Sequence, residues 1–325
     1  MDKNTLIGAL LIGAVLIGFT WFSKPDPTQS PAPSPQDTTQ LVTQAPAPVA
    51  GATSTDSASL DSLGAPVLPP YLQPTEERIV ELKNEKLSVK LSTKGGAPVE
   101  AVLADYLDQS KKPVHLFRKG DARLDLPLRT LENRLVSTAD ANFSVVESTD
   151  STAVLRMQID DVAYLDYAYK LRPADYRVDL VIRGHELRRF LPVNIALQDI
   201  EWTQRIPQQE QSWKFEGQYS GVYYHFPQGD VDRLETTSES SEDVQETLRW
   251  VAFKDKYFSS ALIASATGFK DNKLSIKAAK EGSGYVRDCS FKGTFPISIK
   301  ETETVLPFTF FFGPNDYDLL RGYDA

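Results

Sequence analysis

Cysteine, histidine and methionine are scarce in this 325-residue sequence, which contains one, three and two of them respectively. A single cysteine cannot form an intramolecular disulfide, so Cys289 is expected to be a small buried hydrophobe. His115, His185 and His225 lie far apart and match neither the H-x-x-x-H nor the H-E-x-x-H spacing of zinc ligands. We therefore expect no disulfide and no metal ion.

Nucleotide-binding and nucleophile motifs are also missing. The sequence has no G-x-S-x-G elbow, no G-x-x-x-x-G-K phosphate loop and no G-x-G-x-x-G that opens a helix after a strand. Neighbouring carboxylates such as Asp160 and Asp161 would point to opposite faces of a strand, so their adjacency does not create an acid/base pair. We expect no catalytic residue, no cofactor and no enzymatic activity.

Positive charge is in deficit, because 35 Lys and Arg residues stand against 44 Asp and Glu residues, for a net charge of −9. Binding to nucleic acid requires clustered Lys and Arg that neutralise phosphates, so no nucleic-acid partner is expected. The hydrophobic content of 41%, which includes 16 Phe and 13 Tyr, is ample for a large globular core.

The sequence contains a single long apolar run, which lies at the N-terminus. Thr5 to Phe22 are 18 uncharged residues, which as a helix would cover roughly 27 Å, enough for a bilayer core. A cleavable signal peptide has a shorter apolar region of about 7–15 residues and a small-residue cleavage site, which this run lacks. We predict an uncleaved transmembrane anchor over residues 1–23 rather than a signal peptide or a buried core helix. Its apolar side chains include Leu6, Ile7, Leu10, Leu11, Val15, Leu16, Ile17, Phe19, Trp21 and Phe22.

The next segment, residues 24–74, has a different composition. Of the 21 prolines in the sequence, 11 lie between Pro25 and Pro74, among Ser, Thr, Gln, Ala and Asp. Such a segment cannot bury enough apolar surface to offset the entropy of ordering. We predict a disordered, partly extended linker, and a Pro-rich recognition motif is the alternative.

After residue 75 the sequence alternates between apolar and polar residues with the period of a β-strand. The clearest examples are Leu87–Leu91, Leu155–Ile159, Tyr176–Leu180 and Phe308–Phe312. Many strands and few helical patterns indicate a mainly β protein, with one antiparallel sandwich or barrel spanning roughly residues 75–314.

Two further segments are ambiguous or helical. Residues 242–253 contain good helix formers, but the aromatic and β-branched residues that follow favour strands there. Near the C-terminus, Asn315 and Asp316 can cap a short helix over residues 318–321, which ends before Gly322.

The stretch from Gly217 to Pro227 is the strongest candidate for a binding site. Tyr223, Tyr224 and His225 lie between glycines, and aromatic rings with an imidazole can line a groove for a sugar ring or an extended peptide. The alternative is that these side chains pack one edge of the sandwich.

Several segments, in order along the chain, resemble the N-terminal part of the YidC membrane protein insertases of Gram-negative bacteria. The first is Met1–Thr5, just before the apolar run, and the second consists of residues 87–96, 99–106 and 113–117, which resemble the first strands of the family's periplasmic domain. The others are the Y-x-G-V stretch at 219–222, the W-x-A-x-K stretch at 250–263 and the closing stretch at 313–320. Asn315 departs from the Lys usual in that last stretch. The positions that match family motifs are Gly95, Gly96, Tyr219, Gly221, Trp250, Lys254, Phe258, Gly313 and Pro314.

This resemblance implies an inner-membrane protein with a cytoplasmic N-terminus and a periplasmic domain over residues 75–325. That domain would be a β-supersandwich similar to galactose mutarotases. The implied partners are membrane lipid, nascent inner-membrane proteins and Sec translocon components including SecDF. In the family, a polar groove within five further helices lowers the cost of moving polar groups across the bilayer.

No second apolar run of 18 or more residues follows Phe22, so that insertase groove is missing from this sequence. We expect a fragment of a longer insertase, and a naturally truncated product is the alternative. A membrane-anchored sugar-binding or mutarotase-like protein is the alternative function, and it would need a His and a carboxylate that converge on one pocket.

Overall fold

A computed structural model describes residues 68–323, apart from 235–237 and 266. The predicted anchor, with its apolar side chains from Leu6 to Phe22, lies outside the described residues, and so does most of the predicted linker. Among the described residues, no helix has the length and apolar character needed to cross a bilayer.

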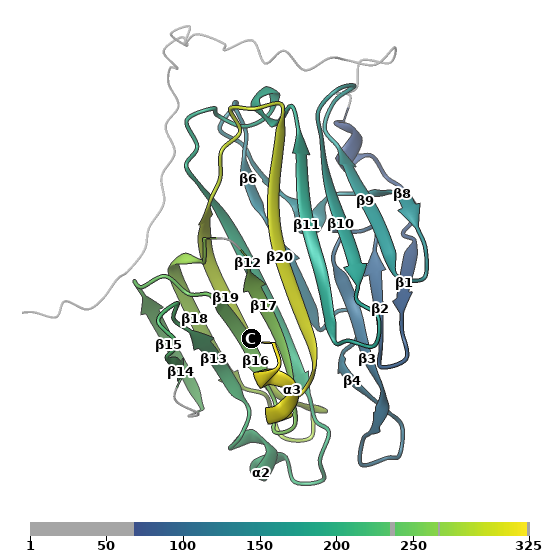
Figure 1. The fold of residues 1–325 in the computed structure, drawn as a ribbon, viewed down its shortest axis with the longest axis vertical. Coiled ribbons are helices and arrows are strands. Elements are labelled where there is room, and N and C mark those ends of the chain that lie inside the picture. Colours follow the sequence, from purple (N-terminus) through teal and green to yellow (C-terminus); the bar gives the residue numbers. More distant parts are fainter. Residues whose placement is uncertain (1–67, 235–237, 266, 324–325) are drawn as a thin grey trace, which may run out of the picture. The chain divides into compact units, whose positions relative to one another are not determined.

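The described residues form an antiparallel β-sandwich (Figure 1), in which every strand pairing is antiparallel. One layer is a nine-stranded sheet. In spatial order its strands are β14 (Val231–Arg233), β13 (Gly221–His225), β16 (Trp250–Lys254), β17 (Phe258–Ala264), β20 (Glu303–Pro314), β11 (Arg177–His185), β10 (Tyr164–Leu171), β9 (Thr152–Gln158) and β8 (Ser144–Ser148).

Two smaller sheets form the facing layer. The five-stranded sheet has the order β15 (Glu239–Val244), β18 (Lys270–Ala278), β19 (Tyr285–Pro296), β12 (Leu197–Pro207) and β5 (Ala122–Asp125). The four-stranded sheet has the order β1 (Ile79–Lys83), β2 (Leu87–Ser92), β3 (Pro98–Leu107) and β4 (Pro113–Phe117). A separate hairpin joins β6 (Pro127–Arg129) to β7 (Leu135–Ser137).

The helices among the described residues are all short. Three are 3-10 turns, namely η1 (Pro70–Leu72), η2 (Thr138–Asp140) and η3 (Leu187–Arg189). Two are single α-helical turns, α2 (Trp213–Gly217) and α3 (Tyr317–Arg321). The predicted cap of the C-terminal helix is confirmed, because the Asp316 carboxylate accepts a hydrogen bond from the Leu319 backbone N–H at 2.9 Å.

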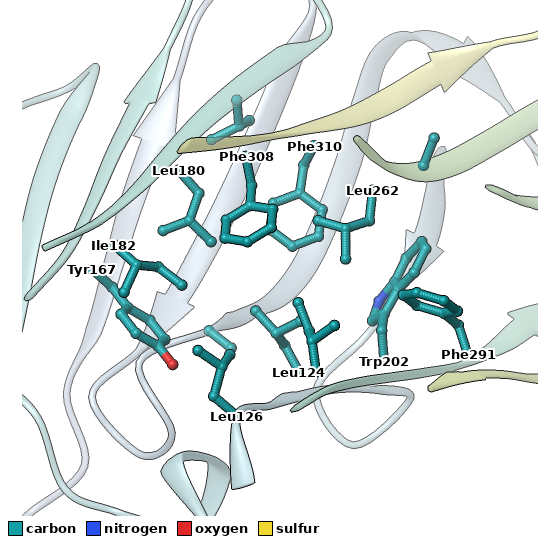
Figure 2. Close-up of a cluster of buried hydrophobic side chains, with 14 of the residues drawn as sticks. Leu124, Leu126, Tyr167, Leu180, Ile182, Trp202, Leu262, Phe291, Phe308 and Phe310 are labelled. Carbon is teal, nitrogen blue, oxygen red and sulfur yellow. The ribbon is translucent and has the colours of Figure 1, made fainter. Parts of the chain in front are cut away.

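The hydrophobic core lies between the two layers, where apolar side chains from facing strands interlock (Figure 2). Trp202 on β12 stacks on Phe253 of β16, with ring centroids 4.0 Å apart. Phe117 on β4 meets Phe312 of β20 edge to face at 5.3 Å. Both smaller sheets therefore pack against the same face of the nine-stranded sheet, and burial of these large rings is the main stabilising term.

The predicted mainly β antiparallel sandwich with a short C-terminal helix is confirmed. Each of the four alternating segments lies in or overlaps a strand, namely β2, β9, β11 and β20. The ambiguous stretch 242–253 falls in β15 and β16 rather than in a helix.

Gly95 and Gly96 form a turn between β2 and β3. Both residues have positive φ angles, 80° and 66°, which side chains rarely adopt. A Cβ on Gly95 would lie 2.8 Å from the Ala139 carbonyl oxygen. The turn is held further by the Tyr169 hydroxyl, which donates to the Gly96 carbonyl at 2.9 Å.

The folded body begins N-terminal to residue 75. Tyr71 is only 6% exposed, and its ring packs edge to face on Phe190 at 5.8 Å. Asn142 donates its backbone N–H to the Tyr71 carbonyl and its side-chain amide to the Gln73 carbonyl. Tyr71 thus adds one large aromatic side chain to the core from within the segment whose composition indicates a linker.

Candidate functional site

The candidate site is a groove of about 270 Å³ on the outer face of the nine-stranded sheet, away from the core. Part of its floor is made of small side chains. Ala252 of β16 lies directly opposite Ala261 of β17 in the strand register, and Trp250 lies opposite Ile263. Because two paired alanines fill little volume, the sheet surface is hollow at this point, with the Trp250 ring beside the hollow.

Three arginines line this groove, and two of them are neutralised by carboxylates. Arg172 forms two hydrogen bonds to Asp179, at 2.9 and 2.7 Å. Arg177 forms two hydrogen bonds to one oxygen of Asp175, at 2.9 and 2.6 Å. Arg249 is exposed and forms no ion pair with any described residue. The groove therefore combines an apolar floor with one uncompensated positive charge.

Helix α3 and the residues after it close one side of the groove. Leu320 and Tyr323 line the groove, and the Tyr323 ring packs on Phe311 at 5.9 Å. The Tyr323 hydroxyl donates to Asp175 at 2.6 Å, while the Arg177 guanidinium lies 3.8 Å from the centre of the Tyr323 ring. This contact fixes the C-terminal turn against the sheet.

The same contact shifts two pKa values. Burial and the hydrogen bond to Asp175 raise the pKa of Tyr323 to about 12. Burial acts to raise the pKa of Asp175, but the hydrogen bonds from Arg177 and Tyr323 outweigh it and hold that pKa below its ordinary value. Asp175 is therefore ionised, and Tyr323 protonated, at neutral pH.

Asn315, which stands where the YidC pattern has Lys, links the start of α3 to the sheet. The Ser259 hydroxyl donates to its side-chain oxygen at 2.5 Å, and its side-chain amide donates to the Asp255 carbonyl at 3.2 Å. Its backbone N–H donates to the Tyr257 carbonyl at 2.6 Å. An amide can donate and accept in this way, whereas a Lys side chain can only donate.

The three side chains predicted to form a groove are divided between two faces of β13. Tyr224 is 1% exposed and points into the core side, where its hydroxyl donates to Glu242 at 3.1 Å. Tyr223 and His225 are half-buried on the opposite face. The His225 ring stacks on Trp250 at 5.3 Å, so His225 lies next to the groove but not in its lining. The physical reason is the two-residue period of the strand.

The family-like positions are spread over the molecule rather than gathered at one site. Of these positions only Trp250 lines the groove. Lys254 ends β16 and lies over the Tyr223 ring at 5.1 Å, and Phe258 begins β17 and packs on Tyr106 at 5.2 Å. Tyr219 is 45% exposed just before Gly221, which begins β13. Gly313 and Pro314 end β20, where a Cβ on Gly313 would lie 2.8 Å from Tyr176.

Histidine–carboxylate pairs occur in the structure but outside the groove. His115 Nδ1 lies 3.1 Å from Glu100 Oε1, and His185 contacts Glu303 across the edge of β11 and β20. No histidine or carboxylate is among the described residues that line the groove. In the described part of the chain there is also no cluster of three or more potential metal ligands. The pairing required for mutarotase chemistry is therefore not found at this cavity.

Sequence reasoning missed the groove arginines and Tyr323. Arg172, Arg177, Arg249 and Tyr323 come from distant parts of the sequence and are brought together by the order of β11, β20, β17 and β16. The alternation around Trp250 was the one local signal, since it places Trp250 and Ala252 on one face of the strand.

Solved structures of galactose mutarotase-related proteins show a weak likeness to this chain. A galactose mutarotase related enzyme from Lactobacillus acidophilus has a TM-score of 0.45 and 8% identity, covering 72% of this chain and 97% of that one. A galactose mutarotase-like protein from Lactobacillus casei has a TM-score of 0.44 and 11% identity, covering 72% of this chain and 100% of that one. Likeness at this level carries no argument about function.

Sequence relatives are much closer. The chain is 44% identical over 336 residues to "Membrane protein insertase YidC" of Porphyromonas gingivalis, and 33% identical over 341 residues to the protein of that name from Bacteroides fragilis. Each match covers 100% of this chain and 53% of the relative, so the chain spans about half the length of these relatives. Residues 79–325 also match the model of the YidC periplasmic domain, and the chain therefore belongs to the YidC periplasmic domain family.

Proposed function

We propose that this chain is the N-terminal region of a YidC-type membrane protein insertase, which assists the insertion and folding of inner-membrane proteins. The match of residues 79–325 to the YidC periplasmic domain carries this proposal. The apolar run from Thr5 to Phe22 anchors the chain in the inner membrane with its N-terminus in the cytoplasm. The Pro-rich residues that precede Tyr71 are the linker, and the β-sandwich, a supersandwich of the mutarotase type, is periplasmic.

The proposed role of the sandwich is binding, without covalent chemistry. The groove offers the Trp250 ring, an apolar floor and the guanidinium of Arg249, which forms no ion pair with another described residue. An extended polypeptide segment with apolar side chains and an acidic group matches these features, because the guanidinium binds carboxylates and the ring stacks on apolar groups. The proposed occupants are segments of nascent inner-membrane proteins or of Sec translocon components such as SecDF.

Membrane topology is the first test. In spheroplasts that produce the 325-residue chain, we expect retention in the membrane after alkaline carbonate extraction and digestion of the sandwich by added protease. Recovery of soluble protein whose N-terminus begins after Phe22 would contradict the anchored arrangement.

Site-specific photo-crosslinking tests the groove. A photoreactive amino acid at Ala252, on the groove floor, is expected to give crosslinks to SecDF or to a nascent membrane protein, identified by mass spectrometry. The matched control is Val146, which is 52% exposed on the edge strand β8 of the same sheet. Equal crosslinking from both positions would remove the groove from the proposal but leave membrane anchoring intact.

A further inference from the structure

An exposed cluster of aromatic rings lies around Lys256, outside the groove. Its members are Phe215 of α2, Tyr219, and Tyr257 in the turn between β16 and β17, each 45% exposed. The Lys256 ammonium lies 4.5 Å from the centre of the Phe215 ring and 4.4 Å from that of Tyr257. Phe215 and Tyr219 contact each other edge to face at 5.2 Å. We call these four residues the aromatic cluster; α2 lies at the lower end of Figure 1.

The backbone beneath this cluster is held by buried polar contacts. Glu216 is fully buried, and its carboxylate accepts hydrogen bonds from the backbone N–H groups of Gln209 and Glu210 at 2.9 and 3.1 Å. Arg287 donates to the Gly217 carbonyl at 2.6 Å, and the Trp213 indole donates to the Tyr285 carbonyl at 2.9 Å.

These contacts fix α2 with Phe215 facing outwards. A five-residue helix has little stability of its own, so its conformation depends on these tertiary bonds. The sequence thus provides a rigid support for an apolar ring that remains in water. Ordinary solubility would favour a polar side chain at such a position, and exposed aromatic groups that gather in one place mark interaction sites.

We propose that the aromatic cluster docks into the headgroup region of an anionic lipid bilayer. Tyrosine and phenylalanine rings are favoured at that depth because the ring is apolar while the phenol end of tyrosine reaches water and headgroups. Lysine side chains extend their ammonium groups towards lipid phosphates from the same depth. The inference rests on the proposed function for the presence of a membrane beside the domain.

Charge at the cluster favours this partner. Lys256 lies within the cluster and Lys214 is exposed on α2, although the chain as a whole carries a net charge of −9. The acidic groups that interact with Lys256 are Glu210 and Glu216, and the Glu216 carboxylate is buried beneath the surface. In the neighbouring loop the Asp316 carboxylate caps α3. Two lysines beside exposed rings complement a negatively charged lipid surface.

A fluorescent probe beside the cluster tests the inference. Gln218 is exposed next to α2, so a Gln218→Cys variant places an environment-sensitive dye there without altering the cluster. The native Cys289 is buried and burial raises its thiol pKa, so it does not react under native conditions. The whole chain is reconstituted into vesicles of phosphatidylethanolamine and phosphatidylglycerol with and without spin-labelled lipid.

We expect lipid quenching of the Gln218 probe to exceed, by about fivefold or more, that of the same dye at Leu131→Cys in the β6–β7 loop. Leu131 is itself an apolar residue, 57% exposed. Adding the substitutions Phe215→Ser and Tyr257→Ser should abolish the difference while leaving the near-ultraviolet circular dichroism spectrum native. Replacing phosphatidylglycerol with phosphatidylcholine should reduce the quenching.

Three results would overturn the inference. Quenching could be equal at the two positions, or it could persist in the Phe215→Ser/Tyr257→Ser variant. The Gln218 probe could also respond to protein concentration in lipid-free detergent, which would assign the cluster to a second copy of the chain. Carbonate extraction of the same vesicles separates these cases from failure of the proposed function. If the chain stays in the membrane and quenching is equal at the two positions, only the docking inference is wrong. If carbonate extracts the chain, both the membrane anchor and the docking inference are wrong.

Discussion

Phe310 and Thr309 are neighbours on β20, but they belong to opposite faces of the nine-stranded sheet. Phe310 is 1% exposed and meets Trp202 across the sandwich, whereas the Thr309 hydroxyl donates to Asp179 on the outer face at 3.1 Å. The inner face is made of large apolar rings, and the outer face carries arginine–carboxylate pairs beside small or aromatic side chains. The difference indicates that stability resides on the inner face, while the outer face carries the groove for which binding is proposed.

The largest expected effect is loss of a ring from the inner face. Phe310→Ala should lower the free energy of unfolding by about 3–5 kcal/mol, because it removes buried apolar area and leaves a cavity. Thr309→Ala, one position along on the other face, should cost only about 1 kcal/mol for its hydrogen bond. Denaturant unfolding of the whole chain in mild detergent measures both, and equal losses would contradict the division between the faces.

Asp255, the residue after β16, is a buried carboxylate, so its titration tests the comparison between the buried and the exposed face. Burial and the nearby Glu216 carboxylate raise its pKa to about 7. Since the folded state holds this proton more tightly than the unfolded state, the contribution of Asp255 to stability is fully present below about pH 4. It falls as the pH rises towards 7, by on the order of 4 kcal/mol.

Asp255→Asn removes that titration. The variant should gain stability relative to the native chain between pH 4 and 7, measured as unfolding free energies at a series of pH values. Asp140→Asn is the matched control with the opposite sign, because the hydrogen bond from Arg123 lowers the pKa of Asp140. A difference between Asp255→Asn and the native chain that does not change with pH would contradict the assignment.

On the outer face, Arg156 and Asp166 form a partly buried bidentate ion pair, in which Arg156 donates hydrogen bonds of 2.7 and 2.8 Å to the two carboxylate oxygens. Arg156→Met leaves the Asp166 carboxylate, 7% exposed, without its partner and should cost about 2 kcal/mol. Arg189→Met breaks the exposed pair with Asp160 and should cost less than about 1 kcal/mol. The two unfolding midpoints provide the measurement, and a larger loss for Arg189→Met would count against burial as the cause.

The smallest expected effect concerns the C-terminal turn at the groove. Tyr323→Phe removes the hydrogen bond to Asp175 and should lower the unfolding free energy by about 1 kcal/mol. Amide hydrogen exchange in α3 should become faster, because the turn is held to the sheet at this point. Tyr317→Phe is the control, since Tyr317 is 74% exposed; equal exchange in both variants would show that Tyr323 does not secure the turn.

Much of the fold could be predicted from the sequence, because alternation is a local property. The pattern Leu87, Val89, Leu91 already gives both the strand and its buried face, and all three residues are fully buried in β2. The Asp316 cap and the Gly95–Gly96 turn are equally local, since each depends on the chemistry of a few adjacent residues.

The candidate binding surfaces could not be predicted in the same way. Tyr223, Tyr224 and His225 are consecutive and were expected to line one groove, yet the strand divides them between two faces. Conversely, Arg177 and Tyr323 are far apart in the sequence and are in contact in the structure. Adjacency along a strand separates side chains, whereas pairing between strands brings them together.

The amino-acid sequence by itself determined the class of fold, the family, and the contrast between an apolar N-terminal run, a Pro-rich segment and a β-rich body. Only the tertiary structure decided where a hollow forms, which arginine beside it has no ion pair among the described residues, and which aromatic rings stay in water. The physical reason is that strand periodicity and turn chemistry act over a few residues, while grooves and exposed clusters depend on the order of strands in the sheet.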